Sequence, residues 1–156
     1  MTVRSVVRGV VRGVARDVVS APDGRELVAN GSFSSGSGWT LGTGWSIAGG
    51  VAKSDGSGGA TDYIGRALLA SVSTGQTIRW RVTLTNEGAA PETSSGTVLE
   101  IAEDAIGNGV TTVIDLAGQP AGTYSGTFIH TGPPASFVVF SYRTVACGID
   151  NLSIIA

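Results

Sequence analysis

The amino-acid sequence predicts an all-β protein whose body is an antiparallel β-sandwich of the jelly-roll type. Short segments rich in β-branched residues recur along the chain, and turn residues separate them at a spacing of roughly 8 to 15 residues. Glycine supplies 24 of the 156 residues, and only 14% of the residues are charged. Many short strands joined by glycine-rich turns are typical of sandwiches and jelly rolls.

The expected strands follow one another without a convincing helix between them. The pair Gly49-Gly50 predicts a tight hairpin, because glycine adopts the positive φ angles that such turns need. The pair Asn30-Gly31 predicts a turn after the first strand. We expect about nine strands in all. In chain order the candidate segments lie at Glu26–Asn30, Trp45–Ala48, Val51–Lys53, Thr61–Leu69, Thr77–Thr85, Thr97–Glu103, Thr111–Leu116, Thr123–Thr131, Ser136–Thr144 and Gly148–Ile155.

The segment Thr77–Thr85 has the clearest strand pattern, because polar and apolar residues alternate along it. Its apolar face, which we expect to line the core, is formed by Ile78, Trp80, Val82 and Leu84. Arg79 and Arg81 lie on the opposite face. At about 130 residues the strand-rich body is large enough to enclose a core between two sheets.

Residues 1–25 differ from the rest of the chain, and we interpret them as a docking or oligomerisation arm before a body at residues 26–156. Five arginines against two aspartates give this arm a net charge of +3, whereas five basic and ten acidic groups give the body −5. A helical arm would carry a valine stripe beside a row of arginines at i, i+4 spacing. An extended arm would place arginine and valine on opposite faces. The residues that define the arm are Val3, Arg4, Val7, Arg8, Val11, Arg12, Val14 and Arg16.

Several function classes lack the residues that they need. The single cysteine, Cys147, excludes a disulfide scaffold, and the single histidine, His130, excludes a multi-histidine metal site. No nucleophile motif surrounds His130, and no pair of carboxylates is arranged for glycoside hydrolysis, so we expect a non-enzymatic protein without a cofactor. No apolar run approaches the ~18 residues of a membrane helix, and the acidic body is unsuited to nucleic acid.

The two ends of the body resemble jelly-roll carbohydrate-binding modules. The residues that match the opening motif of those modules are Asn30, Gly31, Phe33, Gly38 and Trp39. The residues that match their closing strand are Asp150, Asn151 and Leu152. The resemblance implies a jelly-roll sandwich from about Glu26 to Ile155, with Trp39 in its core.

The same resemblance implies a structural calcium ion near Asp150. In those modules an acidic residue after the phenylalanine often helps the aspartate of the last strand to hold the ion, and calcium requires several oxygen ligands. In this chain the position of that acidic residue is taken by Ser34. The serine argues against a calcium site, and Asp150 would then bond backbone groups at a turn or strand edge.

Glycan binding by such a module would use aromatic rings, on which the apolar face of a sugar packs, and polar groups that hydrogen-bond its hydroxyls. The residues that we consider for this role are Trp45, Tyr63, Arg79 and Arg81. The alternative for Trp45 is a position in the core. The alternative for the two arginines is an ordinary solvated face of the sheet.

A basic arm directly before such a domain also resembles the architecture of small bacteriophage virion proteins. We therefore expect a virion structural protein, such as a capsid decoration, head-fibre or tail component, that docks onto other capsid or tail proteins through its arm. We expect it on the virion surface as a homo-oligomer, with a trimer favoured, where its domain would bind host-surface glycan. The alternative is a secreted, free-standing or accessory glycan-binding module.

Overall fold

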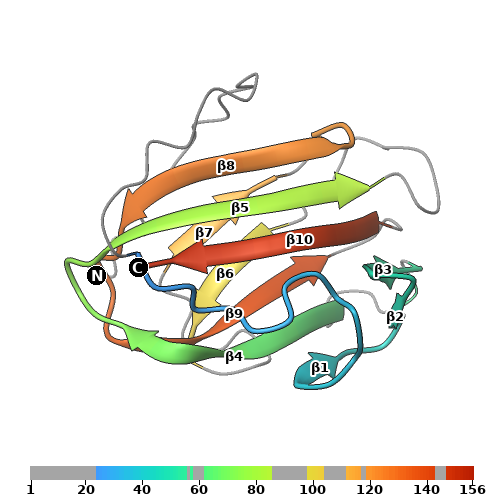
Figure 1. Ribbon diagram of the computed structural model, residues 1–156, viewed down its shortest axis with the longest axis horizontal. Coiled ribbons are helices and arrows are strands. Elements are labelled where there is room, and N and C mark those ends of the chain that lie inside the picture. Colours follow the sequence, from blue (N-terminus) through green and yellow to red (C-terminus); the bar gives the residue numbers. More distant parts are fainter. Residues whose placement is uncertain are drawn as a thin grey trace.

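The computed structural model describes residues 24–55, 57, 62–85, 98–103, 112–116, 119–142 and 147–156. Within these residues the chain forms ten strands and no helix (Figure 1). The strands are β1 (Trp39–Leu41), β2 (Trp45–Ala48), β3 (Val51–Ser54), β4 (Asp62–Val72), β5 (Thr77–Thr85), β6 (Val98–Ala102), β7 (Thr112–Asp115), β8 (Gly122–Ile129), β9 (Ala135–Tyr142) and β10 (Cys147–Ile155). The described part of the chain accordingly offers no helix that could span a membrane.

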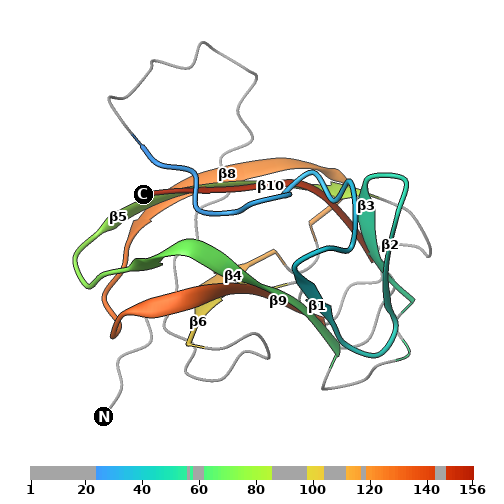
Figure 2. The same ribbon diagram turned by 60° about the horizontal axis from the view of Figure 1, so that its bottom comes forward.

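The strands form two five-stranded sheets that pack face to face (Figure 2). The first sheet has the order β1-β4-β9-β6-β7, and the second has the order β2-β3-β10-β5-β8. Every pairing between neighbouring strands is antiparallel. The predicted antiparallel β-sandwich is therefore confirmed.

The core lies between the sheets and is filled by side chains that alternate along the strands. The apolar face predicted for Thr77–Thr85 is buried on β5 in full, whereas Arg81 on its other face is exposed. Trp39 and Trp80 belong to the core cluster, as predicted. Trp45 belongs to the same cluster with only 7% of its surface exposed, so the core alternative describes its position.

The sequence pattern and the structure differ at the start of the body. The short strand β1 has no clear sequence pattern, and Glu26–Asn30 is not a strand, because only Glu26 forms a β-bridge, to Ile155. The Leu27 N–H donates to the Ile154 carbonyl in the second sheet (2.7 Å), and the Leu27 carbonyl accepts from Leu69 in the first (2.8 Å). Because its backbone hydrogen-bonds to both sheets, this segment does not continue as a paired strand of either sheet.

The predicted hairpin at Gly49-Gly50 is confirmed, since both glycines have positive φ angles (63° and 82°) between the paired strands β2 and β3. Residues 1–23 of the predicted arm lie outside the described residues. Where the described chain begins, Arg25 exchanges two backbone hydrogen bonds with Ala156 (2.9 and 3.1 Å). This exchange ties the base of the arm to the end of β10.

Candidate functional site

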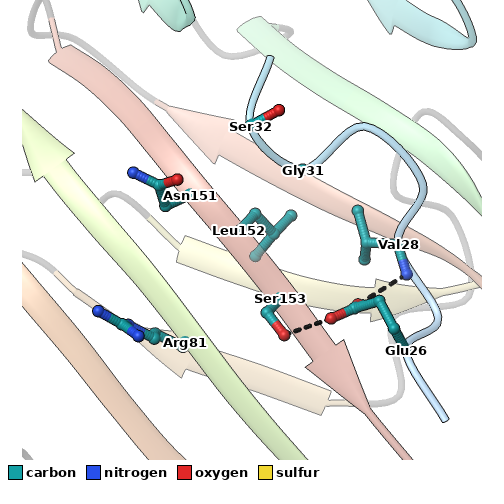
Figure 3. Close-up of a pocket in the computed structure, with 8 residues that line it drawn as sticks. All are labelled: Glu26, Val28, Gly31, Ser32, Arg81, Asn151, Leu152 and Ser153. Atoms are coloured by element: carbon teal, nitrogen blue, oxygen red, sulfur yellow. Dashed lines mark hydrogen bonds between the residues drawn. The ribbon is translucent and has the colours of Figure 1, made fainter. Parts of the chain in front are cut away.

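A groove of about 520 Å³ lies along the second sheet, between the segment that precedes β1 and the strands β10 and β5 (Figure 3). Hydroxyl, amide, carboxylate and guanidinium groups line it, together with two apolar side chains. The lining residues are Glu26, Val28, Gly31, Ser32, Arg81, Asn151, Leu152 and Ser153. We call this set the Arg81 groove.

The Arg81 groove exists because two segments from opposite ends of the body approach each other through their backbones. The Leu152 N–H donates to the Gly31 carbonyl (2.8 Å). A Cβ atom on Gly31 would lie 1.9 Å from the Leu152 carbonyl oxygen, so only glycine fits at this position. The pairing of β10 with β5 is irregular between Asp150 and Ser153, and Asn151 there has a φ of 50°. The closing strand thus bulges where the opening segment reaches it.

Glu26 forms one wall of the groove, and its carboxylate is held by hydrogen bonds. One carboxylate oxygen accepts from the Val28 N–H (2.9 Å) and from the Ile154 N–H (3.0 Å). The other accepts from the Ser153 hydroxyl, a bond that Figure 3 shows. A carboxylate with three internal donors is a fixed structural acceptor that links the opening segment to β10.

Arg81 supplies the cation of the groove. Its side chain is exposed on β5, and among the residues that the structure describes its guanidinium makes no hydrogen bond or ion pair. Ser32 and Asn151, which are also exposed, add a hydroxyl and an amide to the same groove. A guanidinium group donates several hydrogen bonds in a fixed plane, which suits hydroxyl and carboxylate oxygens of a ligand.

The structure does not bring the four predicted glycan-binding residues together. Arg81 lines the groove, but Arg79, two residues along the same face, lies against the backbone of Gly24, where an added Cβ atom would come within 2.6 Å of its guanidinium. Tyr63 is on β4 in the other sheet, beside the fully buried Ile64, so it faces the opposite side of the sandwich. Trp45 is buried, which leaves its ring without an open face for a sugar.

The remaining groove residues come from the two motifs that carry the family resemblance or lie next to them. In the sequence, Gly31, Asn151 and Leu152 are markers of the fold. No sequence pattern points to Ser32, Ser153 or Glu26 as ligand contacts. The available signal was the Asn30-Gly31 turn and the Asp-Asn-Leu run. Neither pattern predicts that the two segments meet beside Arg81.

The atoms expected to bind calcium are engaged in other contacts. Both carboxylate oxygens of Asp150 accept hydrogen bonds from Asn151, one from its backbone N–H (2.7 Å) and one from its side-chain amide (2.6 Å). The Ser34 hydroxyl donates to the Asn30 side-chain carbonyl (2.7 Å), which also accepts from the Ser34 N–H. In the described part of the chain no group of three His, Cys, Asp or Glu residues is placed to hold a metal ion. Asp150 thus bonds a neighbouring backbone group, as the alternative to a calcium site describes.

The titratable residues outside the groove have structural surroundings. His130 is fully buried, and its Nε2 lies 2.9 Å from the Pro133 carbonyl oxygen, so it packs within the fold. The pKa of Asp55 lies below its usual value, because the side chain and the backbone N–H of Ser57 hydrogen-bond to this exposed carboxylate. Cys147 begins β10.

Three solved structures place this fold among known ones, although no protein-family model and no curated protein matches the chain. A family 16 carbohydrate-binding module is similar over 83% of this chain and 99% of its own, with 15% identity and a TM-score of 0.53. The CBM22-1 and GH10 modules of a Clostridium thermocellum endo-1,4-beta-D-xylanase 10B match over 83% of this chain, with 14% identity and a TM-score of 0.50.

The third structure is the enzymatically active domain of tailspike protein 4 of bacteriophage CBA120, which is similar over 84% of this chain with 16% identity and a TM-score of 0.50. This chain spans only 28% of the xylanase chain and 21% of the tailspike chain. At such identities the similarity concerns the fold. The body of this protein is a jelly-roll sandwich of the kind found in carbohydrate-binding modules.

Proposed function

We propose that this protein is a non-enzymatic glycan-binding module and that the Arg81 groove is its binding site. The observation that carries the proposal is a polar groove in which an exposed guanidinium has no hydrogen-bond or ion-pair partner among the described residues. Sugars present many hydroxyl groups, and acidic sugars add a carboxylate, so a groove of hydroxyl, amide and guanidinium groups matches their chemistry. The jelly-roll fold, shared with carbohydrate-binding modules, is consistent with this function.

The groove is already organised before a ligand arrives. Three internal donors hold the Glu26 carboxylate, and the backbone bond between Gly31 and Leu152 holds the two walls together. Buried Val28 and Leu152 form an apolar part of the lining. Because little has to be ordered on binding except the Arg81 side chain, the entropy cost of binding falls mainly on that one residue.

Replacing Arg81 by alanine is expected to weaken glycan binding by at least about tenfold, the usual contribution of a hydrogen bond to a charged group. A glycan array identifies the ligand, and calorimetric titration then measures Kd for the wild type and the variant. Arg79→Ala is the matched control, since it removes the same charge from the same strand at a position outside the groove lining. We expect it to bind as the wild type does.

Two results would contradict this proposal in different ways. If no glycan binds the wild type, the proposed function is wrong. If a glycan binds and Arg81→Ala leaves Kd unchanged while Tyr63→Ala weakens it, the function stands and the site lies on the first sheet.

A second candidate function is that of a virion structural protein, which docks through its arm onto other capsid or tail proteins and displays the body on the virion surface. The contrast between an arm of +3 and a body of −5 supports it, because a small charged segment outside the body is suited to contact an acidic partner. The likeness of the body to part of a phage tailspike is consistent with it. The two functions are compatible, since a displayed domain can bind a host-surface glycan.

Removal of residues 1–23 is expected to abolish incorporation into particles and to lower the oligomer mass, while the body stays folded. The deletion ends before Arg25, whose hydrogen bonds to Ala156 belong to the body. Particle incorporation by mass spectrometry and solution mass by light scattering provide the measurements, with thermal unfolding as the control. Normal incorporation and an unchanged mass would exclude the arm as the docking element.

A further inference from the structure

Within the described residues, β8 is the longest strand that ends a sheet. It has eight residues and lies at the end of the second sheet, paired on one side with β5 (Figure 1). The other strands that end a sheet, β1, β2 and β7, have only three or four residues. No described strand pairs with the outer side of β8. An edge of this length presents a row of backbone donors and acceptors on which another strand can pair.

The register of β8 with β5 identifies which residues direct their backbone groups outward. The His130 N–H donates to the Gln76 carbonyl (2.9 Å), in line with the pairing of Thr77 with Ile129. Opposite residues in antiparallel strands alternate between hydrogen-bonded and non-hydrogen-bonded pairs. The odd-numbered residues of β8 therefore form the non-hydrogen-bonded pairs with β5. The hydroxyls of Thr83 and Thr123 lie 2.9 Å apart, as expected of such a close pair. The residues whose N–H and C=O therefore face the free edge are Thr123, Ser125, Thr127 and Ile129.

These residues carry none of the features by which natural proteins protect an edge strand. Such edges are usually shortened or carry lysine, proline or other charged residues that prevent pairing. Between Gly122 and Ile129 the sequence GTYSGTFI contains no charged residue and no proline. The four outward residues are all exposed, and Ile129 is 60% exposed, which is the largest value among the exposed large apolar residues of the described chain.

We propose that β8 is a self-association edge, through which a second copy of this chain pairs its own β8 in the antiparallel direction. A symmetric pair requires a surface that tolerates itself, and an uncharged strand brings no like charges together. The two second sheets then form one continuous ten-stranded sheet across a twofold axis. Pairing through β8 would give a dimer, whereas the sequence favoured a trimer.

The pleat selects the register of this pairing. The side chains of residues directly opposite each other in two strands must lie on the same face of the sheet. The twofold axis therefore places one residue of β8 opposite the same residue of the second copy. An axis at Gly126 places Ser125 opposite Thr127 of the partner subunit and Thr123 opposite Ile129 of the partner subunit. This register uses every outward residue, and it places the hydroxyl-bearing residues Ser125 and Thr127 opposite each other across the edge.

Sedimentation equilibrium of the full chain, at concentrations up to about 1 mM to cover weak complexes, tests the proposal. We expect the wild-type mass to rise to that of a dimer. Ser125→Lys places a charge on the free edge, and Thr127→Pro removes an N–H that faces away from β5, so both variants should stay monomeric with β8 still paired to β5. Ser46→Lys is the matched control, since it adds the same charge to the exposed face of β2 at the opposite edge of this sheet.

Each outcome decides the proposal. The proposal is supported if the wild type and Ser46→Lys are dimers and both β8 variants are monomers that unfold thermally as the wild type does. A wild-type monomer at every concentration overturns it. A dimer that persists in both β8 variants also overturns it, and its loss on removal of residues 1–23 would assign self-association to the arm.

Discussion

Replacing Trp39 by alanine is expected to lower the free energy of unfolding by about 4 kcal/mol, the usual cost of removing a buried tryptophan side chain. The Trp39 ring is 7% exposed and lies with its centroid 4.7 Å from that of the fully buried Phe33. The Arg66 guanidinium carbon lies 5.5 Å from the Trp39 ring centroid, and Arg66 also donates to the Ser37 carbonyl (2.7 Å). The substitution therefore removes a packed ring and leaves a cavity beneath a cation.

Urea denaturation of Trp39→Ala and of Trp39→Phe measures this effect and separates its parts. The phenylalanine variant keeps an aromatic ring but loses the hydrogen bond from the indole N–H to the Asn30 carbonyl (3.2 Å), so we expect it to lose only about 1–2 kcal/mol. Equal losses in the two variants would mean that the hydrogen bond, and not the packing, stabilises this corner. A loss below about 1 kcal/mol for alanine would show that the site closes around the missing ring.

Replacing Gly31 by alanine is expected to lower the free energy of unfolding by about 3 kcal/mol, at the upper end of the usual cost of forcing an extra group into a packed site. The new Cβ atom would overlap the Leu152 carbonyl oxygen, which is a backbone atom and cannot rotate away. The two segments must separate, which breaks the hydrogen bond from Leu152 to Gly31 and distorts the Arg81 groove. We therefore expect glycan affinity to fall together with stability.

Gly36→Ala is the matched control for this substitution. No atom lies within 4 Å of a Cβ atom built at Gly36, which belongs to the same loop region, and its φ is not positive. Chemical denaturation should leave this variant within about 0.5 kcal/mol of the wild type, as for ordinary surface substitutions. If Gly31→Ala is equally harmless, the close approach of the two ends does not hold the sandwich together.

Local sequence patterns predicted most of the strands and much of the core. The alternation of Thr77–Thr85 predicted which side of β5 is buried, because side chains of a strand point to opposite faces in turn. The Gly49-Gly50 pair predicted a hairpin, because its φ angles are a local property. The opening and closing motifs implied a sandwich, and the structure is one.

Sequence patterns could not separate Arg81 from Arg79, since both alternate with apolar residues on the same face of β5. The difference arises where the opening segment crosses the second sheet, which places Gly24 over Arg79 and leaves Arg81 beside Glu26 and Asn151. In the same way no local pattern shows that β8 ends a sheet. The sequence by itself determined most of the strands and their buried faces, since these depend on neighbouring residues. Only the tertiary structure decided the groove and the free edge, because both depend on which distant segments pair with a strand and which do not.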